Sequence, residues 1–226
     1  MNKKTAFITL IAVAILAVAA TLYLRRGGSK KNVLKPFQAL GTVAAQETAK
    51  LIGDQGLIVL VVPDFGGTQY PTFDAQMAAF KTEIQKHPGI TIAGTETIKV
   101  GISAPSTSSK LKFVEPTFGR SAPVGPQPGQ LGELAANYTT AKAVVYFVDL
   151  PELNAGDIAA LRQHGTKLIA VSDWQPYYKS LFADNLLQLS VVPRPQPETG
   201  KTPRDMKDWF DRSYALVTAD NAANLP

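Results

Sequence analysis

The chain has 226 residues, of which 45% are hydrophobic and 18% charged, enough for one folded domain with a sizeable core. It contains no cysteine, which excludes disulfides, thiolate metal sites and a cysteine nucleophile without identifying a compartment. The net charge is +5, but seven of the 23 basic residues lie before Pro36 and all 18 acidic residues lie after it. The remainder therefore has a net charge of −2, and nothing in it predicts a nucleic-acid surface.

An uncharged run of twenty residues, TAFITLIAVAILAVAATLYL, extends from Thr5 to Leu24. A helix of that length is about 30 Å long, which matches the hydrocarbon thickness of a bilayer. A cleaved signal peptide is the alternative, since two lysines precede the run and Ala17-Val18-Ala19 has the small-x-small form. We favour an uncleaved transmembrane anchor over residues 1–26, because the run is longer than a usual signal-peptide core.

The basic residues on the two sides of this run give opposite indications of its orientation. Two lysines before it favour an N-terminus inside the cell, whereas five basic residues soon after it favour the reverse. A short cationic tail before a long apolar run is typical of a bacterial signal-anchor. We therefore expect a single-pass protein of the cell (inner) membrane, with residues 27–41 as a tether and the domain at 42–226 outside the cytoplasm.

Beyond the tether, helical and strand patterns alternate along the chain. An apolar stripe predicts a helix over 42–52, and Gly53 is a plausible stop. LIVLVV at 57–62 is typical of a strand that is buried on both faces of a parallel sheet. Apolar spacing then predicts a helix from Thr72, followed by a strand within 90–100. The later predictions are strands at 143–150, 167–174 and 186–193, helices over 131–138, 154–165 and 176–182, and a last helix that includes both Met206 and Val217.

Residues 101–129 interrupt this alternation with five prolines and several serines and glycines. A loop of this length inside a compact domain is uncommon and is usually functional or poorly ordered. KLKFVEPTF, at 110–118, is compatible with a short edge strand within it.

Five apolar strands that alternate with helices predict a doubly wound α/β domain with a mainly parallel five-stranded sheet. Right-handed crossovers favour the strand order 2-1-3-4-5, as in flavodoxin-like folds or in one lobe of a periplasmic binding protein.

In such sheets, ligands bind beyond the carboxyl ends of the strands, near the switch point between strands one and three. Three aspartates and three aromatic residues fall there: Asp64, Asp149 and Asp173, with Phe65, Trp174 and Tyr177. Carboxylates and flat rings suit a small polar ligand such as a sugar, and the same acids could hold Mg²⁺. The alternative is that strand-end aspartates only cap helices or turns.

The stretch DFGGT adds Gly66, Gly67 and Thr68 to the candidate ligand-binding residues. It matches the phosphate-loop string of actin-like sugar kinases, but there the string lies in a hairpin, whereas here a helical pattern begins about four residues later. Neither a dinucleotide-binding nor a Walker motif is present, and Gly66 stands where haloacid-dehalogenase-type phosphatases need a second aspartate. We interpret the glycines as permitting a tight turn or a close backbone approach.

Residues 57–94 resemble the first strand–helix–strand unit of type 1 periplasmic sugar-binding proteins and LacI-type effector domains, in which an apolar strand ending in VPD leads to a loop, an aromatic residue and a long helix. Residues 141–174 resemble a later unit of that family. The resemblance implies a small-molecule pocket near Asp64, Phe65 and Asp173. The family closes two lobes around its ligand, and this chain has residues for only one.

Three functions follow as hypotheses. The first is a membrane-tethered domain that binds a small polar ligand or a partner protein, as an accessory or sensory subunit rather than a catalyst. The second is a scaffold or assembly subunit of a membrane complex. The third is a metal-dependent hydrolase that uses the strand-end aspartates. No cofactor, catalytic residue or dedicated metal site is predicted, and His87 and His164 fit helix ends better than a site.

Overall fold

The structure is a computed structural model that describes residues 33–53, 55–99, 127–194 and 203–223. The expected anchor, the first part of the tether and nearly all of the proline-rich loop lie outside these ranges, as does the strand suggested at 110–118. Within the described residues, no helix combines the length and the apolar character needed to cross a bilayer.

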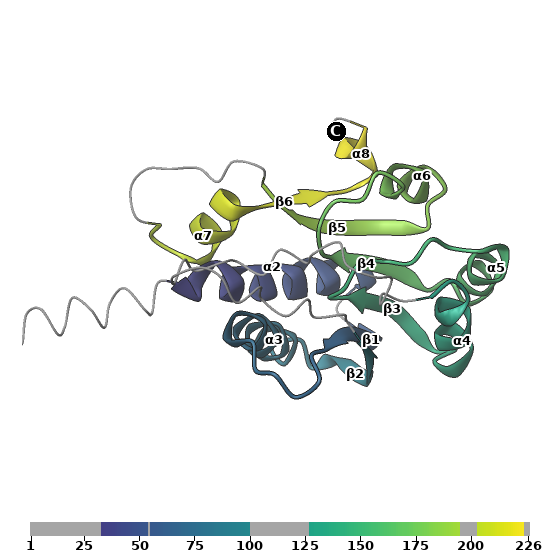
Figure 1. The fold of residues 1–226 in the computed structure, drawn as a ribbon, viewed down its shortest axis with the longest axis horizontal. Helices are drawn as coiled ribbons and strands as arrows, with labels where there is room; N and C mark the ends of the chain where they lie inside the picture. The colour runs from purple at the N-terminus through teal and green to yellow at the C-terminus, as the bar shows by residue number, and fades with distance from the viewer. Residues whose placement is uncertain (1–32, 54, 100–126, 195–202, 224–226) are drawn as a thin grey trace, which may run out of the picture.

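A six-stranded sheet in the order β2-β1-β3-β4-β5-β6 forms the centre of the domain (Figure 1). All neighbouring strands are parallel except β5 and β6, which are antiparallel. The strands are β1 (Gln55–Asp64), β2 (Gly89–Lys99), β3 (Ala141–Tyr146), β4 (Lys167–Val171), β5 (Leu187–Pro193) and β6 (Tyr214–Val217).

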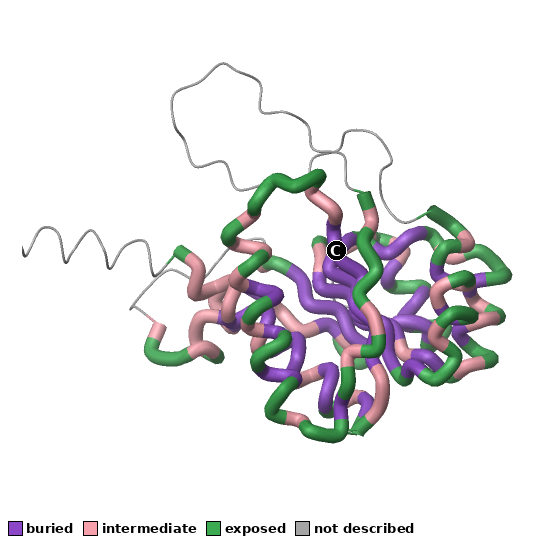
Figure 2. The backbone as a smooth tube through the Cα atoms, turned by 90° about the horizontal axis from the view of Figure 1, so that it is seen from below, coloured by how far each residue is buried: buried purple, intermediate pink, exposed green. Residues whose placement is uncertain are grey.

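The strands alternate their side chains between two apolar clusters, one on each face of the sheet. Ile58 and Leu60 belong to one cluster, and Val59 and Val61 to the other, as the period of two along a strand requires. Figure 2 shows the buried backbone gathered in the interior, beneath an exposed outer layer. The first cluster packs against α2 (Lys35–Ile52), α3 (Pro71–Ile84) and α7 (Met206–Ser213); the second packs against α4 (Gln130–Asn137), α5 (Ala155–His164), α6 (Tyr178–Ala183) and α8 (Ala219–Ala222).

Two predictions about the sheet and its last segment are corrected. The predicted five-stranded order 2-1-3-4-5 differs from the observed order because it lacks β6. Tyr214 to Val217 was expected to continue the last helix, but α7 ends at Ser213. There the Ser213 carbonyl accepts a hydrogen bond from the Arg194 N–H at 2.8 Å, and β6 pairs with β5. Pairing along the open edge of β5 outweighs the helical pattern of these four residues.

The first described helix is also longer than predicted. α2 begins at Lys35 rather than at residue 42, with Pro36 in its first turn, so residues 35–41 of the expected tether are helical. Its buried side is rich in small residues, and Gly41 lies against α3. A Cβ atom built on Gly41 would come within 2.0 Å of the Gln76 carbonyl oxygen, so only glycine permits this approach of the two helices.

We expect Gly41→Ala to destabilise the domain by about 1–3 kcal/mol, because the clash is with backbone and α2 must move away from α3. The measurement is urea unfolding of the two proteins side by side. Gly156→Ala, in the first turn of α5, is the control: its new Cβ would lie 3.2 Å from the Asn154 Oδ1 atom, a much smaller overlap than the 2.0 Å approach at Gly41. Equal midpoints for wild type and Gly41→Ala would show that the helices do not approach this closely.

Candidate functional site

The carboxyl ends of the parallel strands bring three loops to one edge of the sheet, which we call the carboxyl edge. Asp64 is the last residue of β1, whereas Asp149 and Asp173 lie in the loops after β3 and β4. Of the predicted site residues, Asp149 and Asp173 are exposed, and Asp64, Trp174 and Tyr177 are intermediate in exposure. All the candidate residues therefore belong to the same edge, in two separate groups.

The loop after β1 is a tight turn built by Asp64 and the two glycines. The Asp64 Oδ1 atom accepts a hydrogen bond from the Gly66 N–H at 2.8 Å, and the Thr68 N–H donates to the Phe65 carbonyl at 3.2 Å. Gly66 and Gly67 have φ angles of 61° and 82°, in the left-handed region that side chains disfavour. The turn is one of the two roles expected for the glycines, and it engages one oxygen of the Asp64 carboxylate.

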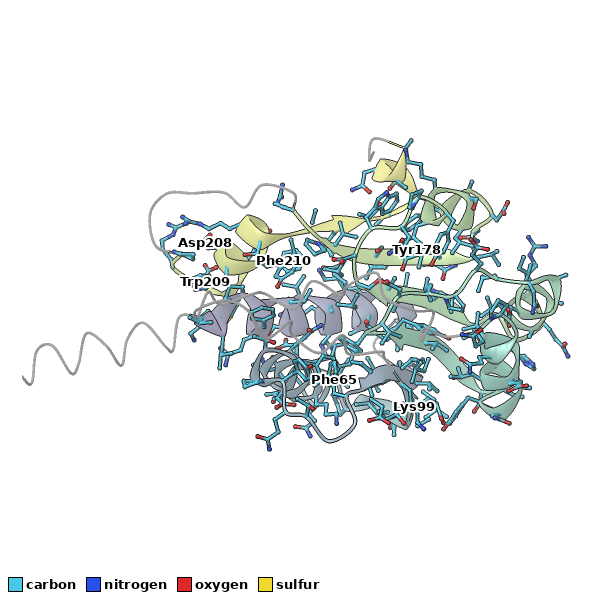
Figure 3. The ribbon with its side chains drawn as sticks, viewed as in Figure 1. Phe65, Lys99, Tyr178, Asp208, Trp209 and Phe210 are labelled. Carbon is cyan, nitrogen blue, oxygen red and sulfur yellow. The ribbon has the colours of Figure 1, made fainter. Side chains whose placement is uncertain are left out.

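A row of aromatic rings runs from this turn into the core. The Phe65 ring centroid lies 4.1 Å from that of Tyr70 and 5.5 Å from that of Phe73. Phe73 is 6.4 Å from Phe147, whose ring is 5.2 Å from the fully buried Phe80. Because Phe147 directly follows β3, the row connects the turn after β1 with the loop after β3. Phe65, which Figure 3 labels, is half-buried and places a ring at the carboxyl edge that Tyr70 and Phe73 contact.

Asp149 and Asp173 form the second group. Partial burial raises the pKa of Asp149, and the nearby Asp173 carboxylate raises it further; hydrogen bonds from Ser172 and Gln175 act in the opposite direction. Burial also raises the pKa of Asp173. No basic side chain among the described residues forms an ion pair with either aspartate. Both residues are exposed as a whole, so the loss of water at their carboxyl groups is only partial, and no basic group in the described part of the chain neutralises them.

Two adjacent tyrosines hold the main chain beside Asp149. The Tyr177 hydroxyl donates to the Leu150 carbonyl, while the Tyr178 hydroxyl accepts from the Leu150 N–H at 3.2 Å. Ser172 Oγ is hydrogen bonded to the Tyr178 hydroxyl at 3.1 Å, which ties the loop after β4 to the same point. Burial raises the pKa of Tyr178 to about 12 and also that of Tyr177, so both hydroxyls keep their protons at neutral pH.

Trp174 packs into the core rather than standing out as an isolated binding surface. Its ring lies nearly parallel to that of Phe182 at 6.5 Å and edge-on to that of Tyr178 at 5.7 Å. Tyr177 likewise packs edge-on against Tyr178 at 5.0 Å. These two aromatic residues therefore position the loop after β4, and the Tyr177 hydroxyl is committed to the backbone.

The Asp173 carboxylate lies near enough to raise the pKa of Asp149, whereas the described hydrogen bonds connect neither residue to Asp64. Phe65 and Tyr178, which mark the two groups, lie apart in Figure 3. Sequence reasoning did not assign Ser172, Gln175 or Tyr178 to the site. Ser172 and Gln175 flank the predicted Asp173, so their closeness to a strand end was the available signal. No feature of the sequence indicated the hydrogen bond between Tyr178 and Leu150, which lie 28 positions apart.

The described part of the chain does not bring together three or more histidine, aspartate or glutamate side chains in a way that could hold a metal ion. The three aspartates proposed for a metal-dependent hydrolase do not converge, because the Asp64 carboxylate is turned to the Gly66 N–H. The alternative that strand-end aspartates serve turns therefore applies to Asp64.

No protein-family model matches the sequence, and no curated protein matches it. Solved structures do match. One is an ABC transporter solute-binding protein from Agrobacterium vitis bound with alpha-D-tagatopyranose, at 15% identity and a TM-score of 0.51, covering 83% of this chain and 58% of that one. Another is an ABC transporter solute-binding protein from Burkholderia graminis in complex with D-arabinose, at 13% identity and a TM-score of 0.51, covering 83% of this chain and 61% of that one. The periplasmic binding protein of the arabinose ABC transporter from Shewanella sp., bound to arabinofuranose, matches at 15% identity and a TM-score of 0.50. The match covers 83% of this chain and 59% of that one.

These matches show a shared fold: the mixed α/β sheet resembles a lobe of a periplasmic solute-binding protein. The expected resemblance to that family is supported at this coarse level. The chain spans about three fifths of the length of the proteins it matches.

We expect Asp149→Asn to raise the thermal unfolding temperature at pH 7 and to lose this advantage in acid. A carboxyl group whose pKa is raised by folding binds protons more tightly in the folded state, so its ionised form opposes folding above that pKa. As the pH falls through the raised pKa towards the ordinary value of 3.8, Asp149 becomes neutral and the difference should vanish. Asp184→Asn, on an exposed helix end, is the control. A difference that stayed constant from pH 7 to pH 3 would contradict the cause assigned to this shift.

Proposed function

We propose that the chain is a membrane-anchored, extracytoplasmic α/β domain that binds a small polar ligand or a partner protein at its carboxyl edge, as an accessory or sensory subunit. The observation that carries this proposal is that Asp149 and Asp173 follow the neighbouring strands β3 and β4, exposed at the carboxyl edge and without an ion pair among the described residues. Carboxylates at this edge are available to accept hydrogen bonds from hydroxyl or amine groups.

The surroundings of the pair support binding rather than chemistry. Tyr177 and Tyr178 fix the backbone next to Asp149, and Phe65 presents a ring that Tyr70 and Phe73 hold in place. Carboxylates and an anchored ring are typical of sites that orient a small polar molecule, and here they stand in two separate groups along one edge. The matched proteins are described with bound monosaccharides, and a solute of that class is therefore the first candidate. In this proposal Asp64, Gly66, Gly67 and Thr68 shape the turn, and Trp174 supports the loop after β4.

We expect a panel of monosaccharides and small polar metabolites to contain at least one compound that raises the thermal unfolding temperature of the full chain. A ligand that binds only the folded state stabilises it by about 2.7 kcal/mol at a hundred times its dissociation constant. Asp173→Asn should abolish the shift, and Asp184→Asn should retain it. If no compound shifts the transition while the chain self-associates or retains partner proteins, the scaffold function is favoured instead. Stabilisation by Mg²⁺ alone would favour the metal-dependent alternative.

We also expect a reporter that is active only outside the cytoplasm to be active when fused after Pro226. The short cationic tail before the apolar run at 5–24 motivates this orientation. An intact, membrane-bound fusion without activity would place the domain inside the cell. It would also make the five basic residues after the run the true orientation signal, and nucleotides would return as candidate ligands.

A further inference from the structure

The hydrogen bonds beside Asp149 form a row whose direction follows from the hydrogen atoms available. At one end, the Leu150 N–H donates to the Tyr178 hydroxyl at 3.2 Å. The Tyr178 hydroxyl lies 3.1 Å from Ser172 Oγ, and either oxygen could be the donor in that contact. At the other end, the Ser172 side chain is hydrogen bonded to the Asp149 carboxyl group. The row thus leaves the loop after β3 at Leu150, crosses to Tyr178 and Ser172, and returns to the same loop at Asp149.

Ionisation of Asp149 fixes the direction of the middle contact. A carboxylate only accepts hydrogen bonds, so Ser172 donates its single hydroxyl hydrogen to Asp149. The other acceptor described for Ser172, the Asp173 carbonyl, lies at 3.4 Å and is not charged, which makes it the weaker one. Because its hydrogen is engaged at Asp149, Ser172 accepts from Tyr178. Every hydrogen in the row then points from Leu150 towards Asp149.

The middle of the row is shielded from water. Tyr178 is fully buried, and the rings of Trp174 and Tyr177 pack edge-on against it at 5.7 and 5.0 Å. Hydrogen bonds in such surroundings are electrostatically stronger than in water, and successive bonds in a row polarise one another. A change at Tyr178 should therefore reach Asp149 through Ser172, although no described hydrogen bond joins Tyr178 to Asp149.

The titratable groups that act on this row come from the loops after β3 and β4 and from the start of α6. Asp173 acts on Asp149, Asp149 acts on both tyrosines, and Glu152 also acts on Tyr177. None of these groups belongs to an ion pair among the described residues. No described ion pair therefore competes with the hydroxyl of Ser172 for the Asp149 carboxylate.

We propose that Ser172 and Tyr178 are positioning residues of the candidate site, which hold the Asp149 carboxylate in one orientation through a directed row of hydrogen bonds from Leu150. The inference rests on the proposed function and deepens it, because it assigns the orientation of a binding group to residues that do not themselves meet the ligand. Asp149 then offers a ligand only the acceptor positions that Ser172 and the Gln175 side chain leave free.

The row is tested by NMR titration of carbon-labelled aspartate side chains in the full chain, without any ligand. Ser172→Ala removes a donor to the ionised form, so it should raise the pKa of Asp149 and lower its acid dissociation constant about threefold. Tyr178→Phe keeps the ring and should change the Asp149 pKa in the same direction by a smaller amount, because Ser172 loses the group that orients and polarises it. In the double variant, the tyrosine substitution should add nothing, since its effect passes through Ser172.

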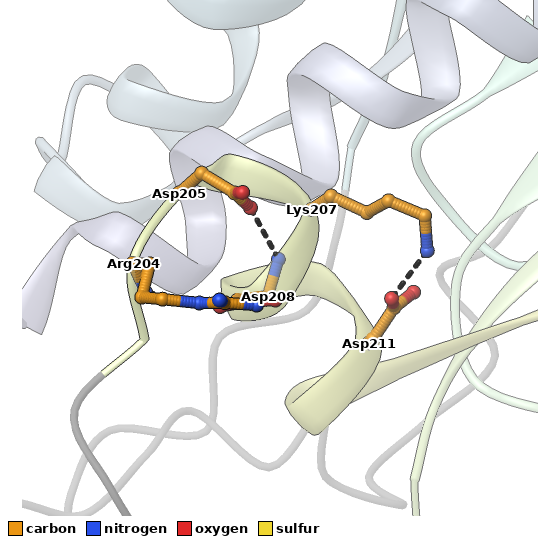
Figure 4. Close-up of polar contacts among 5 residues, drawn as sticks. All are labelled: Arg204, Asp205, Lys207, Asp208 and Asp211. Atoms are coloured by element: carbon orange, nitrogen blue, oxygen red, sulfur yellow. Dashed lines mark hydrogen bonds and ion pairs between the residues drawn. The ribbon is translucent and has the colours of Figure 1, made fainter.

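Tyr177→Phe is the matched control, because Tyr177 also holds Leu150 but lies outside the row. It should leave the Asp149 titration unchanged, whereas a general loosening of the loop would alter that titration in both tyrosine variants. Asp208 gives an internal reference beside α7, on the opposite face of the sheet from Tyr178 (Figure 4). Hydrogen bonds from the backbone and side chain of Arg204 lower the pKa of Asp208, which should be the same in every variant.

An Asp149 titration that ignores Tyr178→Phe would overturn the inference, and so would a tyrosine effect that persists after Ser172→Ala. An equal response to Tyr177→Phe would also contradict it. If Tyr178→Phe does not fold, Ser172→Ala alone still decides, because an Asp149 pKa that fails to rise in this variant breaks the row. The titration is independent of the monosaccharide panel: a panel without a binder would contradict the proposed function and leave the row of hydrogen bonds standing.

Discussion

The domain depends on the burial of both faces of its parallel sheet. β1 places alternate residues in two different apolar clusters, and each cluster must be covered by helices to exclude water. α2, α3 and α7 cover one face, and α4, α5, α6 and α8 cover the other. Once both faces are committed to packing, chemistry is left to the loops at the strand ends. The candidate site lies at the carboxyl edge for this reason, not because of any sequence motif.

Much of the polar chemistry at that edge serves the fold itself. Asp64 closes its own turn, and Tyr177 and Tyr178 satisfy the two backbone groups of Leu150. An unpaired backbone group in that buried position would cost about 1–3 kcal/mol, so these hydroxyls have little freedom to serve a ligand. Asp149 and Asp173 differ, because loss of water raises the free energy of both ionised forms, and the Asp173 carboxylate raises that of Asp149 further. They are the groups that a bound donor would stabilise most.

The features that the sequence revealed are those with strong local physics. LIVLVV at 57–62 can only be a buried segment, and its short length and β-branched residues identify a strand. Tyr214 to Val217 was misjudged because its apolar residues fit a helical stripe, while its pairing depends on β5, which is distant in sequence. The start of α2 was placed late because Ala39 and Gly41 are small and Leu40 is isolated in the sequence, and their burial comes from packing against elements distant in sequence. The tyrosine contacts with Leu150 were likewise invisible, since they join two loops.

The direction of α2 matters for function as well as for packing. A helix that ends two positions before β1 must run back across the sheet, and an 18-residue helix of about 27 Å is long enough to bring its first turn to the carboxyl edge. The parallel contacts with α3 require the same arrangement, and Gly41 makes it possible by letting the two backbones meet. The packing that stabilises one face of the sheet therefore also fixes where the N-terminal part of the chain attaches. The chain therefore enters its first described helix at the edge that holds the candidate site.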